Sequence, residues 1–119
     1  MADNLSYMEH FKSLDDEEKQ AIRKAQEILG SVNSIPCTAC HYCTDGCPMN
    51  IAIPEYFAIY NSLKQFGKTS ASNSRFYFNR LSEYRGKPSD CIECGQCEEH
   101  CPQHLPIISN LKLVSKEYE

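Results

Sequence analysis

The residues of this sequence with the clearest chemical potential are its eight cysteines. All of them lie in two short segments, residues 37–48 and 91–102. Thiolates bind soft metals and thiols also form disulfides, so such a set indicates either metal sites or up to four disulfides. Residues 1–16 are polar and acidic and lack the pattern of a signal peptide, so we expect a cytoplasmic protein. In that reducing compartment, metal binding is the favoured interpretation.

The two segments share one spacing, and the second copy begins 54 residues (91 minus 37) after the first. Each copy has cysteines at positions i, i+3, i+6 and i+10 with a proline directly after the last: Cys37, Cys40, Cys43, Cys47 and Pro48, then Cys91, Cys94, Cys97, Cys101 and Pro102. A tetrahedral zinc site does not require the cysteine at i+6. A [4Fe–4S] cube has four iron corners that each need a thiolate, and positions i, i+3 and i+6 can serve three of them. The spacing therefore predicts two [4Fe–4S] clusters, with zinc or disulfides as the alternatives.

The cysteine before the proline has a distinct predicted role. In ferredoxins with this spacing it binds the cluster of the other segment. By that rule, one cluster is held by Cys37, Cys40, Cys43 and Cys101, and the other by Cys91, Cys94, Cys97 and Cys47. Such crossing keeps the clusters close and suits an electron-transfer module. The alternative is a structural or interaction module in which the metal only stabilises the fold.

Three histidines, His41, His100 and His104, lie inside or beside the cysteine segments. Histidine replaces cysteine at some cluster irons. Because every corner already has a cysteine here, we expect these histidines to be neighbours of the clusters or exposed side chains.

Helices are predicted to flank both segments. Apolar residues at helical spacing indicate a helix over 13–30, with Ser13 as its N-cap and Asp16 as the partner in a capping box. A second helix is expected from Pro54 to Gly67, a loop over 67–74, a third helix over 75–85 and a last helix from Pro106. The three adjacent aromatic residues at 76–78 leave a strand as the alternative for the third helix.

The composition narrows the class of protein. The 119 residues suffice for one domain with a modest core, and 16 acidic against 12 basic residues give a formal charge of −4. This balance argues against a nucleic-acid-binding protein. The mean hydropathy is −0.51, and no apolar run approaches the roughly 18 residues of a membrane span.

With these motifs in view, the sequence resembles the C-terminal dicluster domain of a bacterial and archaeal branch of the aldo/keto reductase family. The resemblance is carried by residues 35–54, residues 91–107 and the N-terminal segment from Leu5 to Gly30. In that family the last segment links a catalytic barrel to the cluster domain. The resemblance therefore implies an aldo/keto reductase barrel domain as partner, in the same full-length polypeptide, and an oxidoreductase activity.

The barrel itself is not in this chain, since 119 residues cannot hold eight strands and eight helices. The family's catalytic residues therefore have no counterparts here, and we predict no catalytic site. All eight cysteine positions match the family's pattern. The sequence does not identify an electron donor or acceptor.

The distance between the motifs indicates the architecture. Compact bacterial ferredoxins place their two motifs close together on hairpins, whereas 43 residues (48–90) separate Cys47 from Cys91 here. Because these residues have the pattern of two helices, we predict an all-α fold, an α-helical ferredoxin with two [4Fe–4S] binding loops. A compact α+β bacterial ferredoxin is the alternative. Residues 1–33 are expected to form a linker and helix, and residues 34–119 the dicluster domain.

Overall fold

The computed structural model describes residues 2–9 and 11–119. The chain divides into two compact units, Met1–Val32 and Asn33–Glu119. The predicted roles of residues 1–33 as a linker and of residues 34–119 as a cluster domain stay predictions.

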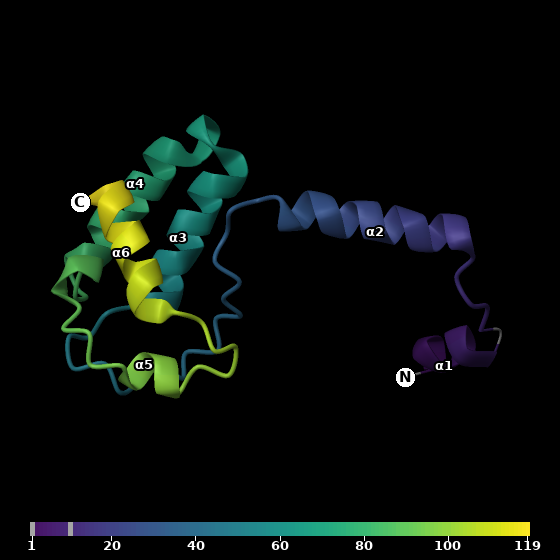
Figure 1. The fold of residues 1–119 in the computed structure, drawn as a ribbon, viewed down its shortest axis with the longest axis horizontal. Helices are drawn as coiled ribbons and strands as arrows, with labels where there is room; N and C mark the ends of the chain where they lie inside the picture. The colour runs from purple at the N-terminus through teal and green to yellow at the C-terminus, as the bar shows by residue number, and fades with distance from the viewer. Residues whose placement is uncertain (1, 10) are drawn as a thin grey trace. The chain divides into compact units, whose positions relative to one another are not determined.

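The described residues of the N-terminal unit form the helices α1 (Ala2–Glu9) and α2 (Asp16–Gly30) (Figure 1). The predicted N-cap of α2, Ser13, is wrong, because Asp15 occupies that position. The Asp15 carboxylate accepts a hydrogen bond from the Glu18 amide at 2.9 Å, and the Glu18 carboxylate accepts one from the Asp15 amide at 2.9 Å. This reciprocal pair satisfies two amides that the first turn would otherwise leave unpaired.

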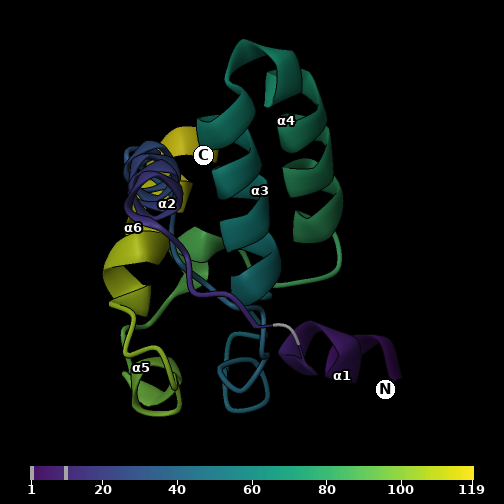
Figure 2. The same ribbon diagram turned by 90° about the vertical axis from the view of Figure 1, so that its right-hand side faces the viewer.

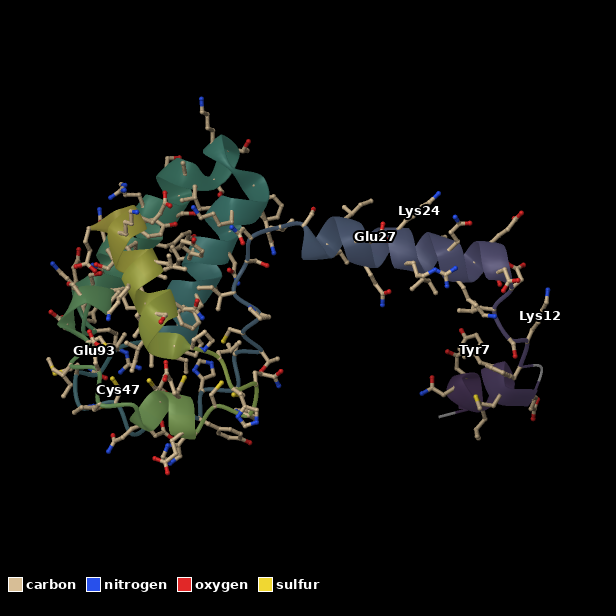
Figure 3. All side chains as sticks on the ribbon, in the orientation of Figure 1. Tyr7, Lys12, Lys24, Glu27, Cys47 and Glu93 are labelled. Carbon is tan, nitrogen blue, oxygen red and sulfur yellow. The ribbon has the colours of Figure 1, made fainter. Side chains whose placement is uncertain are left out.

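No residue of α2 is buried within the described structure, although the helix is amphipathic. The labelled side chains of Lys24 and Glu27 extend away from the helix (Figure 3). The apolar residues Ile22, Ile28 and Leu29, which the sequence places on one stripe, are exposed as well. The described residues of the N-terminal unit therefore carry apolar side chains on their surface.

The C-terminal unit consists of helices and loops. Its elements are α3 (Ile53–Phe66), α4 (Lys68–Ser82), the 3₁₀ turn η1 (Pro88–Asp90), α5 (Gln96–Glu99) and α6 (Ile107–Tyr118). Residues 33–119, all of them described, contain no strand, and their one β-bridge joins Ile51 to Gly86. The all-α prediction is confirmed, and the compact α+β alternative is wrong.

The predicted bounds of α3 agree with the structure, but the predicted loop over residues 67–74 does not. Gly67 has a φ of 55°, which turns the chain sharply, and α4 begins directly after it. The serines of this segment are weak helix formers that gain tertiary partners. Ser70 donates a hydrogen bond to the Ser62 carbonyl of α3 at 2.9 Å, and Ser74 is buried. Packing against α3 therefore overrides the low helix propensity of the segment.

The helices α3, α4 and α6 form the core, and the two cysteine segments with α5 lie at one end of them (Figures 1 and 2). Tyr56 of α3 and Tyr118 of α6 both contact Phe78 of α4. The Phe78 and Tyr118 rings stack at a centroid distance of 4.8 Å, and the Tyr56 and Phe78 rings lie 5.2 Å apart. Arg75 of α4 donates hydrogen bonds to the carbonyls of Glu117 and Tyr118, where the dipole of α6 favours positive charge.

Candidate metal centre

The eight cysteines surround two cavities in the C-terminal unit. The sulfur atoms of this unit are spread across its loop end, where Cys47 is labelled (Figure 3). We define the first cavity by its four cysteines, Cys37, Cys40, Cys43 and Cys101. We define the second cavity by Cys47, Cys91, Cys94 and Cys97. In each set, three cysteines come from one segment and the fourth comes from the other, which is the crossed grouping that the motif predicts.

The two loops share one backbone conformation, related by the offset of 54 residues. Residues with positive φ occur at three matching pairs of positions: Ala39 and Glu93, His41 and Gly95, and Asn50 and His104. Left-handed conformations are costly for residues other than glycine, by roughly 1–2 kcal/mol each. Such strain concentrates at functional sites, and both loops carry it at the same positions.

The hydrogen bonds of the two loops match in the same way. Asn50 donates its amide to the Cys47 carbonyl at 3.0 Å, and His104 donates to the Cys101 carbonyl at 3.0 Å. The amide of each fourth cysteine also bonds to the carbonyl three residues earlier, at 3.1 Å in the first loop and 3.3 Å in the second. These bonds fix each fourth cysteine just before the helix that follows it, α3 or α6.

The apolar walls of the cavities follow the same repeat. Ile51 and Ile53 line the second cavity, and their counterparts Leu105 and Ile107 line the first. Conversely, Pro54 and Phe57 of α3 line the first cavity, and their counterparts Ile108 and Leu111 of α6 line the second. Ile53 is buried and lines both cavities, so it is part of the wall between them. Residues at corresponding positions of the repeat therefore line the two cavities.

Burial changes the acidity of the deepest thiols. It raises the pKa of Cys43 to about 12, partly offset by a backbone hydrogen bond and reinforced by the neighbouring cysteines. It also raises the pKa of Cys97 to about 11, with Cys91 and Glu98 adding repulsion. Without a compensating positive charge, both thiols keep their protons at neutral pH, and metal binding must displace these protons.

The donor set fits an iron–sulfur cluster. Four thiols around an apolar cavity match the one thiolate per corner that a [4Fe–4S] cube requires. All eight cysteines are free of disulfides. Over residues 2–9 and 11–119, no three His, Cys, Asp or Glu side chains converge closely enough to hold a single metal ion.

Two residues that the sequence analysis did not single out as site-forming position the first loop. The side-chain amide of Asn61 on α3 exchanges two hydrogen bonds of 2.7 Å with the backbone of Ile35, directly before the first motif. Gly86 donates its amide to the Asn50 carbonyl at 3.1 Å, directly after that motif. The backbones are so close that a Cβ atom on Gly86 would lie 2.0 Å from the Met49 carbonyl oxygen.

The aromatic and histidine neighbours divide into buried and exposed groups. Phe57 is buried and lines the first cavity, but Tyr42, which directly precedes Cys43, is 66% exposed. His41 lines the first cavity, and its Nδ1 lies 3.6 Å from a carboxylate oxygen of Glu55. His100 and His104 are exposed, in agreement with the prediction.

A helical domain with four thiols around each of two cavities defines the class of cysteine-ligated iron–sulfur proteins. Residues 36–105 match the model of the 4Fe-4S dicluster domain, and the chain belongs to this family. It is thus an iron–sulfur domain of the kind that transfers electrons in oxidoreductases.

Two curated relatives are parts of larger oxidoreductases. The β subunit of an F420-dependent formate dehydrogenase from Methanocaldococcus jannaschii is 32% identical over 71 residues, covering 60% of this chain and 18% of the relative. A component of an ion-translocating oxidoreductase complex from Buchnera aphidicola is 28% identical over 87 residues, covering 73% of this chain and 15% of the relative. The chain thus spans less than a fifth of each relative's length. No solved structure matches it.

None of the described helices is long and apolar enough to cross a membrane.

Proposed function

We propose that this domain binds two [4Fe–4S] clusters and carries electrons between them as part of a larger oxidoreductase. The observation that carries the proposal is the grouping of the cysteines into two sets of four, each around its own apolar cavity. A [4Fe–4S] cluster, when bound, accepts and releases one electron with little change in shape. The first cavity would be served by its own four cysteines, with Cys101 crossing over, and the second by its own four, with Cys47 crossing over.

The protein's own residues give each site the properties of a redox centre. The apolar walls limit water access, which protects the cluster and affects its potential. Ile53 contributes to the walls of both cavities, so the two sites are neighbours, as electron transfer between their clusters would require. The shared core of α3 and α6 holds both sites in fixed positions.

We further propose that the domain works with an aldo/keto reductase barrel in the same polypeptide, as the resemblance implies. The exposed apolar side chains of the N-terminal unit support this partner. Leu5, Tyr7, Met8 and Phe11 are each at least 60% exposed, and α2 buries none of its residues. Apolar surface of this kind is typical of segments that pack against another domain.

The first experiment is analysis of anaerobically purified protein for iron and acid-labile sulfide. The expected result is about eight of each per chain, because each of two cubes holds four irons. Reversible bleaching by a low-potential reductant, with a cubane signal in electron paramagnetic resonance, would support electron transfer. Tightly bound zinc in a colourless protein would refute the proposal. Clusters that no accessible reductant can reduce would favour the structural module instead.

The crossed ligation is tested by four single variants. Cys101→Ser and Cys43→Ser should perturb the same cluster, and Cys47→Ser and Cys97→Ser the other. Spectra of the reduced samples should therefore pair Cys101→Ser with Cys43→Ser. If Cys101→Ser instead pairs with Cys97→Ser, each segment holds its own cluster and the crossing is wrong.

A further inference from the structure

We propose that the residues around the two cavities set their clusters at different potentials, with the higher potential in the first cavity and the lower in the second. This inference rests on the proposed function. It comes from the 54-residue repeat itself, because matching positions place different chemistry beside otherwise equivalent sites. The electron would then rest preferentially in the first cavity, beside Cys37, Cys40, Cys43 and Cys101.

The first difference lies among the exposed residues that line the cavities. Gln103 and Thr38 line the first cavity, and both offer polar hydrogens. Their counterparts in the second cavity are Met49 and Ile92, which offer none. Hydrogen bonds to cluster sulfurs and contact with solvent raise the potential, since both stabilise the more negative reduced state.

The second difference is a charge. Glu98 directly follows Cys97 of the second cavity, is half-buried and accepts a hydrogen bond from the Ile108 amide at 2.8 Å. This bond ties the carboxylate to a residue that itself lines the second cavity. The matching position in the first loop is the neutral Thr44, whose hydroxyl donates to the His41 carbonyl. A fixed negative charge beside a cluster opposes the addition of an electron and lowers the potential.

Other polar and charged groups also lie near the cavities. Glu55 is an acidic residue beside the first cavity: its carboxylate lies 3.6 Å from His41 Nδ1, and Glu55 itself does not line the cavity. On the other side, Glu93 is paired with Lys112 at 2.8 Å. Gln96 lines the second cavity and is its one amide side chain, against the amide, hydroxyl and imidazole that line the first.

The test is a potentiometric titration of the holoprotein followed by electron paramagnetic resonance, with iron and sulfide measured on every sample. The unmodified protein should show two separate reduction steps. Glu98→Gln keeps an oxygen that can accept the Ile108 amide but removes the charge, so the lower step should move upward. Glu99→Gln is the matched control, because Glu99 is exposed, belongs to the same helix and lines neither cavity. It should produce a clearly smaller shift.

A reciprocal exchange at the cavity linings tests the other difference. Gln103→Met should move the upper step downward, and Met49→Gln should move the lower step upward. Each of these variants should therefore narrow the separation between the steps.

The outcomes separate the two proposals. A single reduction step in protein with a full complement of iron, or a shift of the upper step in Glu98→Gln, would overturn the assignment of potentials while leaving the proposed function standing. Protein that binds no iron would overturn the proposed function and this inference with it.

Discussion

Replacing Gly86 by alanine should destabilise the C-terminal unit because two backbone segments meet at this residue. The added Cβ would lie 2.0 Å from the Met49 carbonyl oxygen, whereas real Cβ contacts essentially never fall below 3.0 Å. The backbone must therefore move by about 1 Å, the difference between these two distances. Neither neighbour can yield easily, since the clash is with main chain rather than with a flexible side chain.

The cost can be worked out from the contacts that such a movement disturbs. Loss of the hydrogen bond from Gly86 to the Asn50 carbonyl costs roughly 0.5–1.5 kcal/mol. Forcing an extra carbon into a packed site costs typically about 1–3 kcal/mol. A total of about 1.5–4.5 kcal/mol corresponds to a fall in Tm of at least about 6 °C for a domain of this size.

The assay is thermal unfolding of the holoprotein, followed by circular dichroism and by the visible absorption of the clusters. Gly30→Ala is the matched control. A Cβ atom on Gly30 meets nothing within 4 Å, and alanine is the better helix former at the end of α2. Its Tm should be unchanged or higher. If the Gly86→Ala protein has the same Tm as the Gly30→Ala protein and keeps its iron, the loops do not depend on this close approach.

Two further substitutions test how the helices hold the loops. Asn61→Ala removes both hydrogen bonds to the backbone of the buried Ile35 and should lower the free energy of unfolding by about 1–3 kcal/mol. Asn73 on α4 is exposed, so Asn73→Ala should have little effect. Equal denaturation midpoints of the two variants would contradict this role of Asn61. Leu111→Ala removes part of the wall of the second cavity, so it should lower the free energy of unfolding by about 2–5 kcal/mol and hasten cluster loss in air. Leu113→Ala, at a position 48% exposed, should do neither. Identical bleaching rates of the two variants would count against a protective role of this wall.

The sequence predicts the cysteines of the site better than it predicts the residues that hold the loops in place, because the cysteine spacing is a local pattern. The positions i, i+3, i+6 and i+10 can be read within one segment, and the helices from Pro54 and Pro106 are indicated by proline and apolar periodicity. The final helix is confirmed, with Leu111 and Val114 buried as its pattern indicates. Family membership in the dicluster domains follows from the same local signals.

The residues that hold the loops in place act through contacts between distant parts of the sequence, and such contacts leave no local pattern. Asn61 bonds to Ile35, 26 residues away, and an asparagine within a helix carries no mark of such a partner. The helical state of Ser70 and Ser74 arises from packing against α3 and contradicts their own propensity. The cap of α2 is ambiguous in the sequence because Ser13, Asp15 and Asp16 are all good N-caps, and only the geometry with Glu18 selects Asp15.

The antiparallel pair α3 and α4 explains how motifs 54 residues apart in sequence come to share their ligands. The first loop leads into α3, Gly67 turns the chain, and α4 returns it to the loop end (Figure 2). There Gly86 meets Met49 and Asn50, so the segment entering the second motif is fixed against the segment leaving the first. A tight hairpin does this in a compact ferredoxin, whereas here two packed helices do it. Because the returning helix also contributes Phe78 to the core, the same residues that bring the motifs together stabilise the domain.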